Sequence, residues 1–103
     1  MTPEQAKTTL IHLTRRQNPM NTLKAMIGAS NFSIFENKVA FKFKMFSKAN
    51  YCTIELDEIQ DLYNMVFTKI RGFQFKEHKR IAGICWEDLK GIFERETGLF
   101  LNL

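Results

Sequence analysis

Hydrophobic positions recur with a helical period near both ends of the chain and alternate with polar positions in the middle. Residues 2–5 predict a helix start, because a threonine cap, a proline at the first helical position and a glutamine that completes a capping box follow in order. Pro19 ends this helix, since the residue before a proline avoids the helical conformation. A short second helix is predicted over residues 20–27, with Gly28 as its C-terminal cap.

Residues 32–56 are predicted to form three strands, each with one apolar and one polar side. The first strand begins at Phe32, and the third covers residues 51–56. The second strand covers residues 38–46, where Val39, Phe41, Phe43 and Met45 form one side and Lys38, Ala40, Lys42 and Lys44 form the other. We expect the Phe-rich side to face the core and the lysine side to face solvent.

After an acidic turn at residues 57–61, a fourth strand is predicted over residues 62–71. Its facing stays open, because apolar residues occupy both of its sides. Either Tyr63, Met65 and Phe67 or Leu62, Val66 and Ile70 point inward. Gly72 marks a bulge or a bend.

A polar stretch at residues 76–80 precedes a last helix, which is predicted over residues 83–97. The element order α-α-β-β-β-β-α predicts a single α+β domain over residues 1–103, because short turns favour antiparallel neighbours. We expect an antiparallel meander of about four strands, with N-terminal helices and one C-terminal helix packed on the sheet.

Composition narrows the class of protein. Phenylalanine accounts for 10 of 103 residues, which fits a core of rigid aromatic rings, and the formal net charge is +4. Cys52 and Cys85 are too few for a disulfide framework and are expected to act as small hydrophobic residues. The chain shows neither a secretory signal nor an apolar stretch of membrane-spanning length, so we expect a cytoplasmic protein without a membrane partner.

Groups that carry out chemistry are sparse. His12 and His78 lack neighbouring metal ligands. No sequence signature around Cys85 supplies a base that would activate its thiol. The carboxylates at residues 57–61 lack the spacing of a calcium loop, and the glycines match no phosphate-binding motif. An enzyme would need a cleft that gathers such residues from distant segments. We therefore expect no catalytic residue, metal, cofactor or small-molecule substrate, and a protein that acts by binding.

Two surfaces are candidates for binding. A basic sheet face is predicted from Lys38, Lys42, Lys44, Tyr51, Lys69 and Arg71, with the last two included if the Leu62/Val66 side of their strand points inward. Lysines around an exposed aromatic ring can follow a phosphate backbone and stack a base, whereas the alternative is a plain solvated face. The apolar tail formed by Leu99, Phe100, Leu101 and Leu103 packs either on the domain or on a partner.

Three segments carry a resemblance to other proteins. They run NTLKAMIGASNF at residues 21–32, FTKIRG at residues 67–72 and FERETGLFLNL at residues 93–103. Together they resemble a group of small uncharacterised proteins encoded by phages, prophages and plasmids of Gram-negative bacteria. The group has no known activity, so the resemblance implies only a setting, the accessory gene of a mobile element. The segment Gly83-Ile84-Cys85 is similar to a more usual Gly-Val-Tyr of that group, and Cys85-Trp86 is a local departure from it.

The sequence thus predicts a non-enzymatic binding protein of a mobile element. We expect a protein-interaction module that modulates or inhibits a host complex, with a host protein or a second copy of the chain as partner. The apolar tail and the doubly apolar strand over residues 62–71 favour this function. The alternative is a sequence-tolerant nucleic-acid-binding protein that uses the lysine-rich sheet face.

Overall fold

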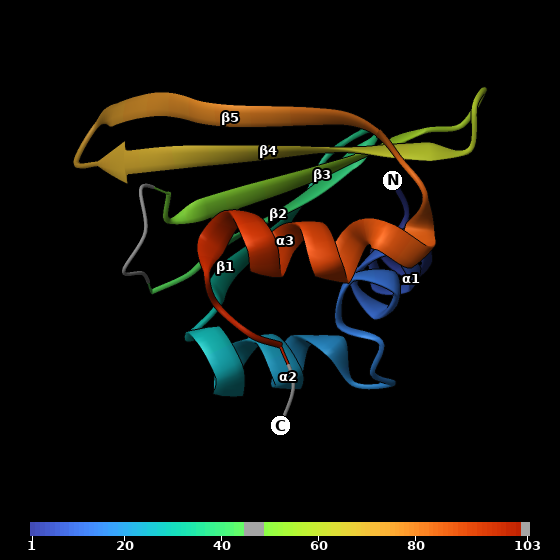
Figure 1. Ribbon diagram of the computed structural model, residues 1–103, viewed down its shortest axis with the longest axis horizontal. Helices are drawn as coiled ribbons and strands as arrows, with labels where there is room; N and C mark the ends of the chain where they lie inside the picture. Colours follow the sequence, from blue (N-terminus) through green and yellow to red (C-terminus); the bar gives the residue numbers. More distant parts are fainter. Residues whose placement is uncertain (45–48, 102–103) are drawn as a thin grey trace.

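The computed structural model describes residues 1–44 and 49–101. In these ranges five strands form one antiparallel sheet, in chain order from β1 to β5 (Figure 1). The strands are β1 (Ser30–Ile34), β2 (Lys38–Lys42), β3 (Tyr51–Asp57), β4 (Leu62–Arg71) and β5 (Gln74–Ile84). The helices are α1 (Pro3–Thr14), α2 (Pro19–Ile27) and α3 (Leu89–Thr97), and a 3-10 turn, η1 (Trp86–Asp88), precedes α3. The predicted α+β meander is confirmed, with one strand more than expected.

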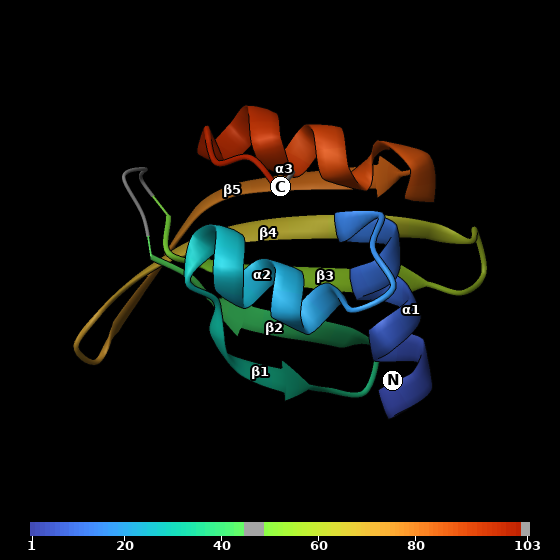
Figure 2. The ribbon, with the colours of Figure 1, turned by 90° about the horizontal axis from the view of Figure 1, so that it is seen from below.

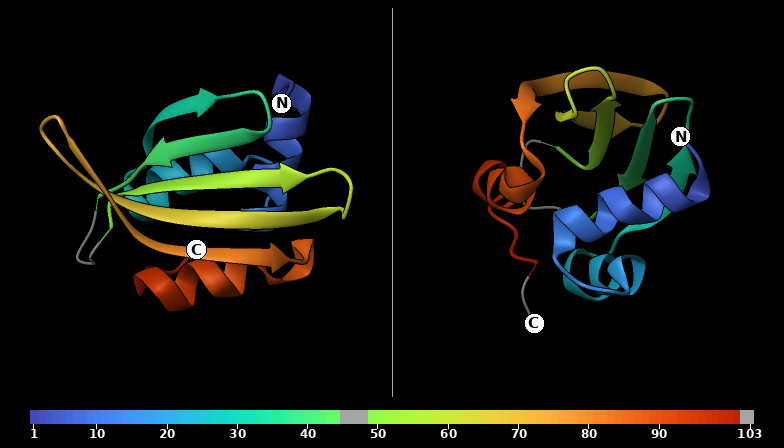
Figure 3. Two further views of the ribbon diagram at one scale, coloured as in Figure 1. Left: turned by 90° about the horizontal axis from the view of Figure 1, so that it is seen from above. Right: turned by 90° about the vertical axis from the view of Figure 1, so that its right-hand side faces the viewer.

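The helices of the described ranges all lie on one face of the sheet, which we call the inner face. Figure 2 shows α2 crossing β2 and β3, with α3 running along β5. The end-on view in Figure 3 separates the two layers, with the sheet on one side and the helices on the other. In the described part of the chain, the opposite or outer face carries no helix, and no helix is both long and apolar enough to cross a membrane.

The predicted start of α1 and the predicted end of α2 form as expected. The prediction that Pro19 ends the first helix is wrong, because α1 ends at Thr14 and Arg15 caps it in the left-handed conformation with a φ of 61°. The Thr2 hydroxyl accepts the Gln5 backbone N–H at 3.1 Å, and the Gln5 side chain accepts the Thr2 backbone N–H at 2.9 Å. This capping box fixes the start of α1. Pro19 is the first residue of α2, and Gly28 ends it in the left-handed conformation.

The Phe-rich side of β2 faces the core, as predicted. The side chains of Val39, Phe41 and Phe43 are 1%, 0% and 2% exposed. They lie against Phe67 of β4 and Phe93 of α3 in one aromatic cluster. Met45, which was assigned to the same side, lies outside the described residues.

The sequence leaves open which side of β4 points to the core, and in the structure the helices decide this. Tyr63, Met65 and Phe67 point to the inner face and are 5%, 0% and 1% exposed. Val66 points to the outer face and is nevertheless only 6% exposed, because neighbouring side chains on that face cover it. Apolar residues thus occur on both sides of this strand although helices cover one side.

The prediction for residues 73–85 is wrong, since the polar stretch belongs to β5 and the last helix begins later than residue 83. β5 pairs with β4 from Gln74 to Ile84. Most of its side chains are exposed on this edge strand, and only towards its end do Ile81 pack against the core and Ile84 enter it. A charged edge strand has no alternating apolar pattern, and charges on an edge strand protect against aggregation.

The apolar tail packs on its own domain. Leu101 is fully buried in the core, and its backbone N–H donates to Glu94 Oε2 at 2.8 Å. Leu99 is half-buried against the core, whereas Phe100 is 68% exposed. The expectation of an exposed interface is therefore wrong for Leu101, and Leu103 lies outside the described residues.

Neighbouring substitutions in the tail should differ sharply in effect. Leu101→Ala should lower the free energy of unfolding by about 2–5 kcal/mol, because it leaves a cavity in the core. Phe100→Ala should change it by no more than about 0.5 kcal/mol, since that ring is exposed. Urea unfolding followed by circular dichroism measures both values, and equal effects of the two substitutions would show that the tail is not part of the core.

Candidate nucleic-acid interface

The strand register determines which side chains meet on the outer face. Alternate residues of a strand point outward, and paired residues form rows across the sheet. In β5 this alternation is interrupted where its register shifts between Lys79 and Glu77. From one end of the sheet to the other, these rows are Lys38–Glu55–Asn64, then Ala40–Thr53–Val66–Arg80, then Lys42–Tyr51–Thr68–Glu77. Beyond the last row, Ile70 pairs with Phe75. Residues far apart in the sequence are thereby brought together.

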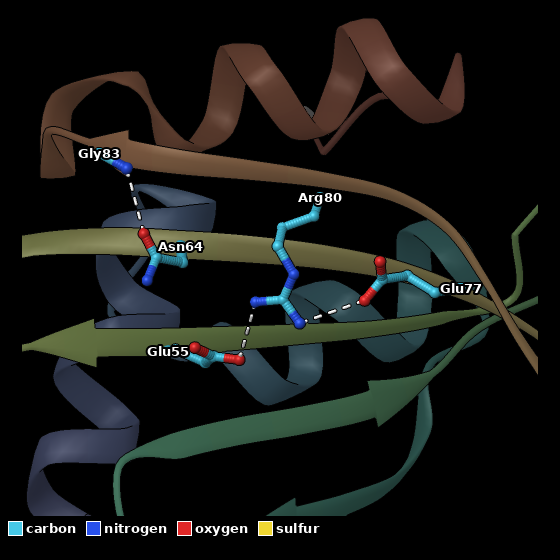
Figure 4. A network of polar contacts seen from close by, with 5 residues as sticks. All are labelled: Glu55, Asn64, Glu77, Arg80 and Gly83. Carbon is cyan, nitrogen blue, oxygen red and sulfur yellow. Dashed lines mark hydrogen bonds and ion pairs between the residues drawn. The ribbon is translucent and has the colours of Figure 1, made fainter.

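Arg80 occupies the middle row and ties β5 to the sheet (Figure 4). Its guanidinium lies 3.5 Å from Glu55 Oε1 and 3.1 Å from Glu77 Oε1. Ala40 and Thr53 in this row are small residues, and they are 0% and 8% exposed. The long Arg80 side chain lies over this row. The charge of Arg80 is thus balanced by carboxylates.

A bulge beside this row gives β5 its bend. Gly83 has a φ of 70°, and its backbone N–H donates to Asn64 Oδ1 at 3.1 Å (Figure 4). The register of β5 shifts between the pairs that Tyr63 and Met65 make. Glycine adopts such a positive φ without steric cost, which is why a side chain other than hydrogen would strain this bulge.

Charge is segregated along the strands. The turns at one end carry carboxylates, and we call this group the acidic end: Glu36, Glu55, Asp57, Glu58 and Asp61. The opposite end carries cations, and we call this group the basic end: Lys42, Lys44, Lys69, Arg71 and Lys76. Glu77 is the acid nearest to this group in the strand rows of the described residues, and it is paired with Arg80. The sheet and its turns therefore carry opposite charge at their two ends.

The hairpin of β4 and β5 projects from the basic end beyond the helices (Figure 2). Gly72, with a φ of 57°, and Phe73 form its two-residue turn, so of the predicted bulge or bend at Gly72 the structure has a reversal of the chain. Phe73 at the tip is 101% exposed, and Phe75 is 71% exposed. Lys69 and Lys76 are paired on this hairpin, and like charges directly opposite each other destabilise a sheet.

Asn50 holds the hairpin in place. Its side chain donates to the Ile70 carbonyl at 3.0 Å and accepts the Ile70 N–H at 2.7 Å. Its backbone N–H donates to the Thr68 carbonyl at 3.0 Å. These bonds fix the start of β3 against β4 close to Tyr51, so the basic end has a defined geometry.

Of the six residues predicted for a basic surface, the structure brings five to this end. Lys42 and Tyr51 are direct neighbours on the outer face. The Lys44 backbone N–H donates to Ile27 at 3.0 Å, and its side chain lies against Gly28 at the end of α2. A positive charge is favourable at this helix end.

Two details of the predicted surface are wrong. Lys69 and Arg71 lie on the inner side of the β4 extension, because they alternate in phase with Phe67. The predicted single basic face is therefore a basic end that presents cations on both sides of the sheet. Lys38 lies at the other end, with its ammonium 5.5 Å from the Phe35 ring centre and its row shared with Glu55.

Sequence reasoning missed the exposed aromatic residues of the hairpin. Phe73 and Phe75 continue the alternation of apolar residues, which normally indicates a buried side. The signal that distinguishes them is the charge around them, since Lys69, Arg71 and Lys76 flank these two phenylalanines in the sequence.

A second aromatic group joins α1 to η1 at the acidic end of the sheet, where Tyr63 follows Asp61. His12 Nδ1 lies 3.1 Å from Tyr63 Oη, and the His12 and Trp86 ring centres are 5.0 Å apart. The Arg15 guanidinium lies 4.8 Å from the centre of the Trp86 ring. Burial, followed by the positive charge of Arg15, lowers the pKa of His12 below its ordinary value, and Tyr63 has a raised pKa because it is buried. This arrangement packs α1 against the segment that leads into α3.

The two cysteines and the acidic turn, which were also considered as candidates, can now be placed in the structure. Cys52 is fully buried, and burial raises the pKa of its thiol, whereas Cys85 is exposed. Asp57 Oδ1 accepts the backbone N–H groups of Ile59 and Gln60 and so shapes the acidic turn. In residues 1–44 and 49–101, no three His, Cys, Asp or Glu side chains group in a way that would hold a metal ion.

An apolar groove lies between the helices and the edge strand β1. It has a volume of ≈ 420 Å³ and is lined mainly by apolar residues, among them Leu10, Met20, Phe32 and Ile34. Met20 and Ile34 are 43% and 46% exposed. In the described chain, β1 pairs with β2 on one side and with no strand on the other. The groove therefore adjoins a free strand edge.

The class defined by these features is a helix-backed antiparallel meander with an open outer face and a basic end. Comparisons with family models, with curated proteins and with solved structures find no match to this chain.

The lowered pKa of His12 predicts a pH-dependent stability. The folded state binds a proton at His12 more weakly than the unfolded state does, so this stabilisation is present above the ordinary pKa of 6.5 and is lost as pH falls below it. Asp61 and Glu87 oppose the shift, while burial and Arg15 cause it. Between pH 7.5 and pH 5, wild-type protein should lose more free energy of unfolding than His12→Gln.

Urea unfolding at several pH values measures this difference. His78→Gln is the matched control, because His78 is exposed on β5, and it should keep the wild-type pH profile. A His12→Gln profile parallel to that of the wild type would contradict the assigned environment of His12.

Proposed function

We propose that this protein binds nucleic acid through its basic end, in a sequence-tolerant manner and without catalysing a reaction. The observation that carries the proposal is the segregation of charge, which places five cationic side chains around one end of the sheet. Contacts between lysine or arginine and phosphates supply most of the affinity in sequence-independent binding. The acidic end repels a phosphate backbone, so it orients the domain with the hairpin toward the polyanion.

The shape of the basic end supports the same partner. Lys42 lies on the outer face, whereas Lys69 and Arg71 lie on the inner side of the projecting hairpin. A nucleic-acid strand that passes around the hairpin can contact the cations on both sides of the sheet at once.

The proposed setting follows from the resemblance to proteins of mobile genetic elements. We propose an accessory protein that acts in the cytoplasm and binds the nucleic acid of the element or of its host.

Charge reversal on one strand tests the proposal, because β2 begins and ends with a lysine. Lys42→Glu at the basic end should weaken oligonucleotide binding by roughly 3- to 10-fold and reduce the slope of log K against log salt by about one. Lys38→Glu changes the net charge equally at the acidic end, so it should leave affinity nearly unchanged. Fluorescence anisotropy with labelled 20-mers at about 50–200 mM salt measures both. Absence of binding at low salt, or equal effects of both substitutions, would refute the proposal.

A second candidate function, protein binding, is favoured by the apolar groove beside the free edge of β1. An extended segment of a partner could pair with β1 and place an apolar side chain between Met20 and Ile34. This retains the expectation of a protein-interaction module but moves its surface away from residues 99–103.

A charge placed in the groove tests this second candidate. Met20→Glu puts a carboxylate at the groove while favouring the first turn of α2, so folding should be preserved. Ala25→Glu adds the same charge on an exposed position of the same helix, outside the groove. A partner captured from nuclease-treated host lysate should be retained by wild type and Ala25→Glu and lost by Met20→Glu. Retention by all three proteins would exclude the groove.

A further inference from the structure

Aromatic side chains are exposed to solvent at the basic end, although five of the nine phenylalanines in the described ranges lie in or against the core. Phe73 and Phe75 are 101% and 71% exposed, and they lie within three residues of each other on the projecting hairpin. Tyr51 is half-buried on the outer face of the same end. Exposed aromatic side chains rimmed by charge are a common feature of binding surfaces.

The register places two of these rings on one surface. Phe75 pairs with Ile70, and Tyr51 pairs with Thr68, which is the next outward residue of β4. Phe75 and Tyr51 therefore flank the same stretch of β4 on the outer face, about two strand spacings apart laterally and two residues apart lengthwise, or roughly 12 Å. Three to four stacked nucleotides of one strand span about this distance, at ~3.4 Å per nucleotide. Lys42 adjoins Tyr51 at the position where a phosphate would lie.

We propose that the ligand of the basic end is single-stranded nucleic acid, whose unpaired bases stack on Phe75 and on the neighbouring Phe73 and Tyr51. This inference rests on the proposed function and specifies its ligand. Aromatic rings on an open sheet face accept bases of any sequence, because every base has a stacking face. The phosphates of a duplex can contact the lysines, but its base faces are covered by stacking inside the duplex. A duplex therefore gains no affinity from these aromatic rings.

The arrangement favours stacking over insertion into a duplex groove. Residues that wedge between base pairs act from the tip of a projecting element. Phe73 is at the tip, whereas Phe75 and Tyr51 are outward residues of paired strands. Deoxyribose and ribose strands share the chemistry used here, and the experiment separates them.

The experiment compares two matched truncations. Phe75→Ala removes a ring at the basic end, and Phe35→Ala removes a 45% exposed ring beside Lys38 at the acidic end. The probes are labelled dT12, rU12 and a 12-base-pair duplex, measured by fluorescence anisotropy as a function of salt. Wild type should bind a single strand more tightly than the duplex. Phe75→Ala should weaken that binding by roughly 5- to 100-fold with an unchanged salt slope, whereas Phe75→Tyr and Phe35→Ala should bind as wild type does.

The outcomes separate this inference from the proposed function. If Lys42→Glu weakens binding but the duplex binds as tightly as the single strands, or Phe75→Ala has no effect, stacking is refuted while the proposed function stands. Tighter duplex binding that depends on Phe73 alone would indicate groove insertion instead and also refute stacking. If no probe binds at low salt, both are refuted. The relative affinities for dT12 and rU12 show which sugar is preferred.

Discussion

Packing around the Phe93 ring of α3 governs the rest of this structure. Its centre lies 6.2 Å from that of Phe41, 5.6 Å from that of Phe43 and 6.0 Å from that of Phe67. Aromatic side chains bury large areas, so this contact strongly favours one sheet face as the inner one. Once Phe41 faces inward, strand alternation forces Lys42 outward, and β3 and β4 follow through their register. The chemistry of the outer face is thus a consequence of how the core packs.

The meander topology places opposite charges at the two ends of the sheet. In an antiparallel meander, every second turn lies at the same end of the sheet. The turns after β1 and β3 therefore meet and bring their carboxylates together, joined by the bond from the Leu56 N–H to the Asn37 carbonyl. The turn after β4 lies at the opposite end with Lys42 and Tyr51. A polyanion approaching such a domain meets an attractive end and a repulsive end.

Strand β5 is held by its backbone pairing with β4, by ion pairs and, near its end, by the buried Ile84. Lys79 lies 2.8 Å from Glu96 of α3 on the inner side, and Arg80 bridges Glu55 and Glu77 on the outer side. Lys79 lowers the pKa of Glu96 mainly by hydrogen bonding. Exposed ion pairs contribute little stability singly, so the backbone ladder with β4 and the buried Ile84 carry most of the attachment. This leaves the outer part of the hairpin available for a ligand.

The sequence by itself determined the features that depend on neighbouring residues. These include the capping box at Thr2, the end of α2 at Gly28 and the two-sided pattern of β2, since each follows from local conformation. The tertiary structure decided what depends on distant partners. Strand β5 pairs through its backbone, and its sequence has no apolar pattern that would predict a strand. Strand β4 is apolar on both sides, and only the position of the helices decides which side is in the core. Leu101 and Phe100 are both apolar, and they differ only in the residues that lie beside them. The cations at the basic end were visible as residues, but their assembly at one end required the register, because strand alternation is local and strand pairing is not.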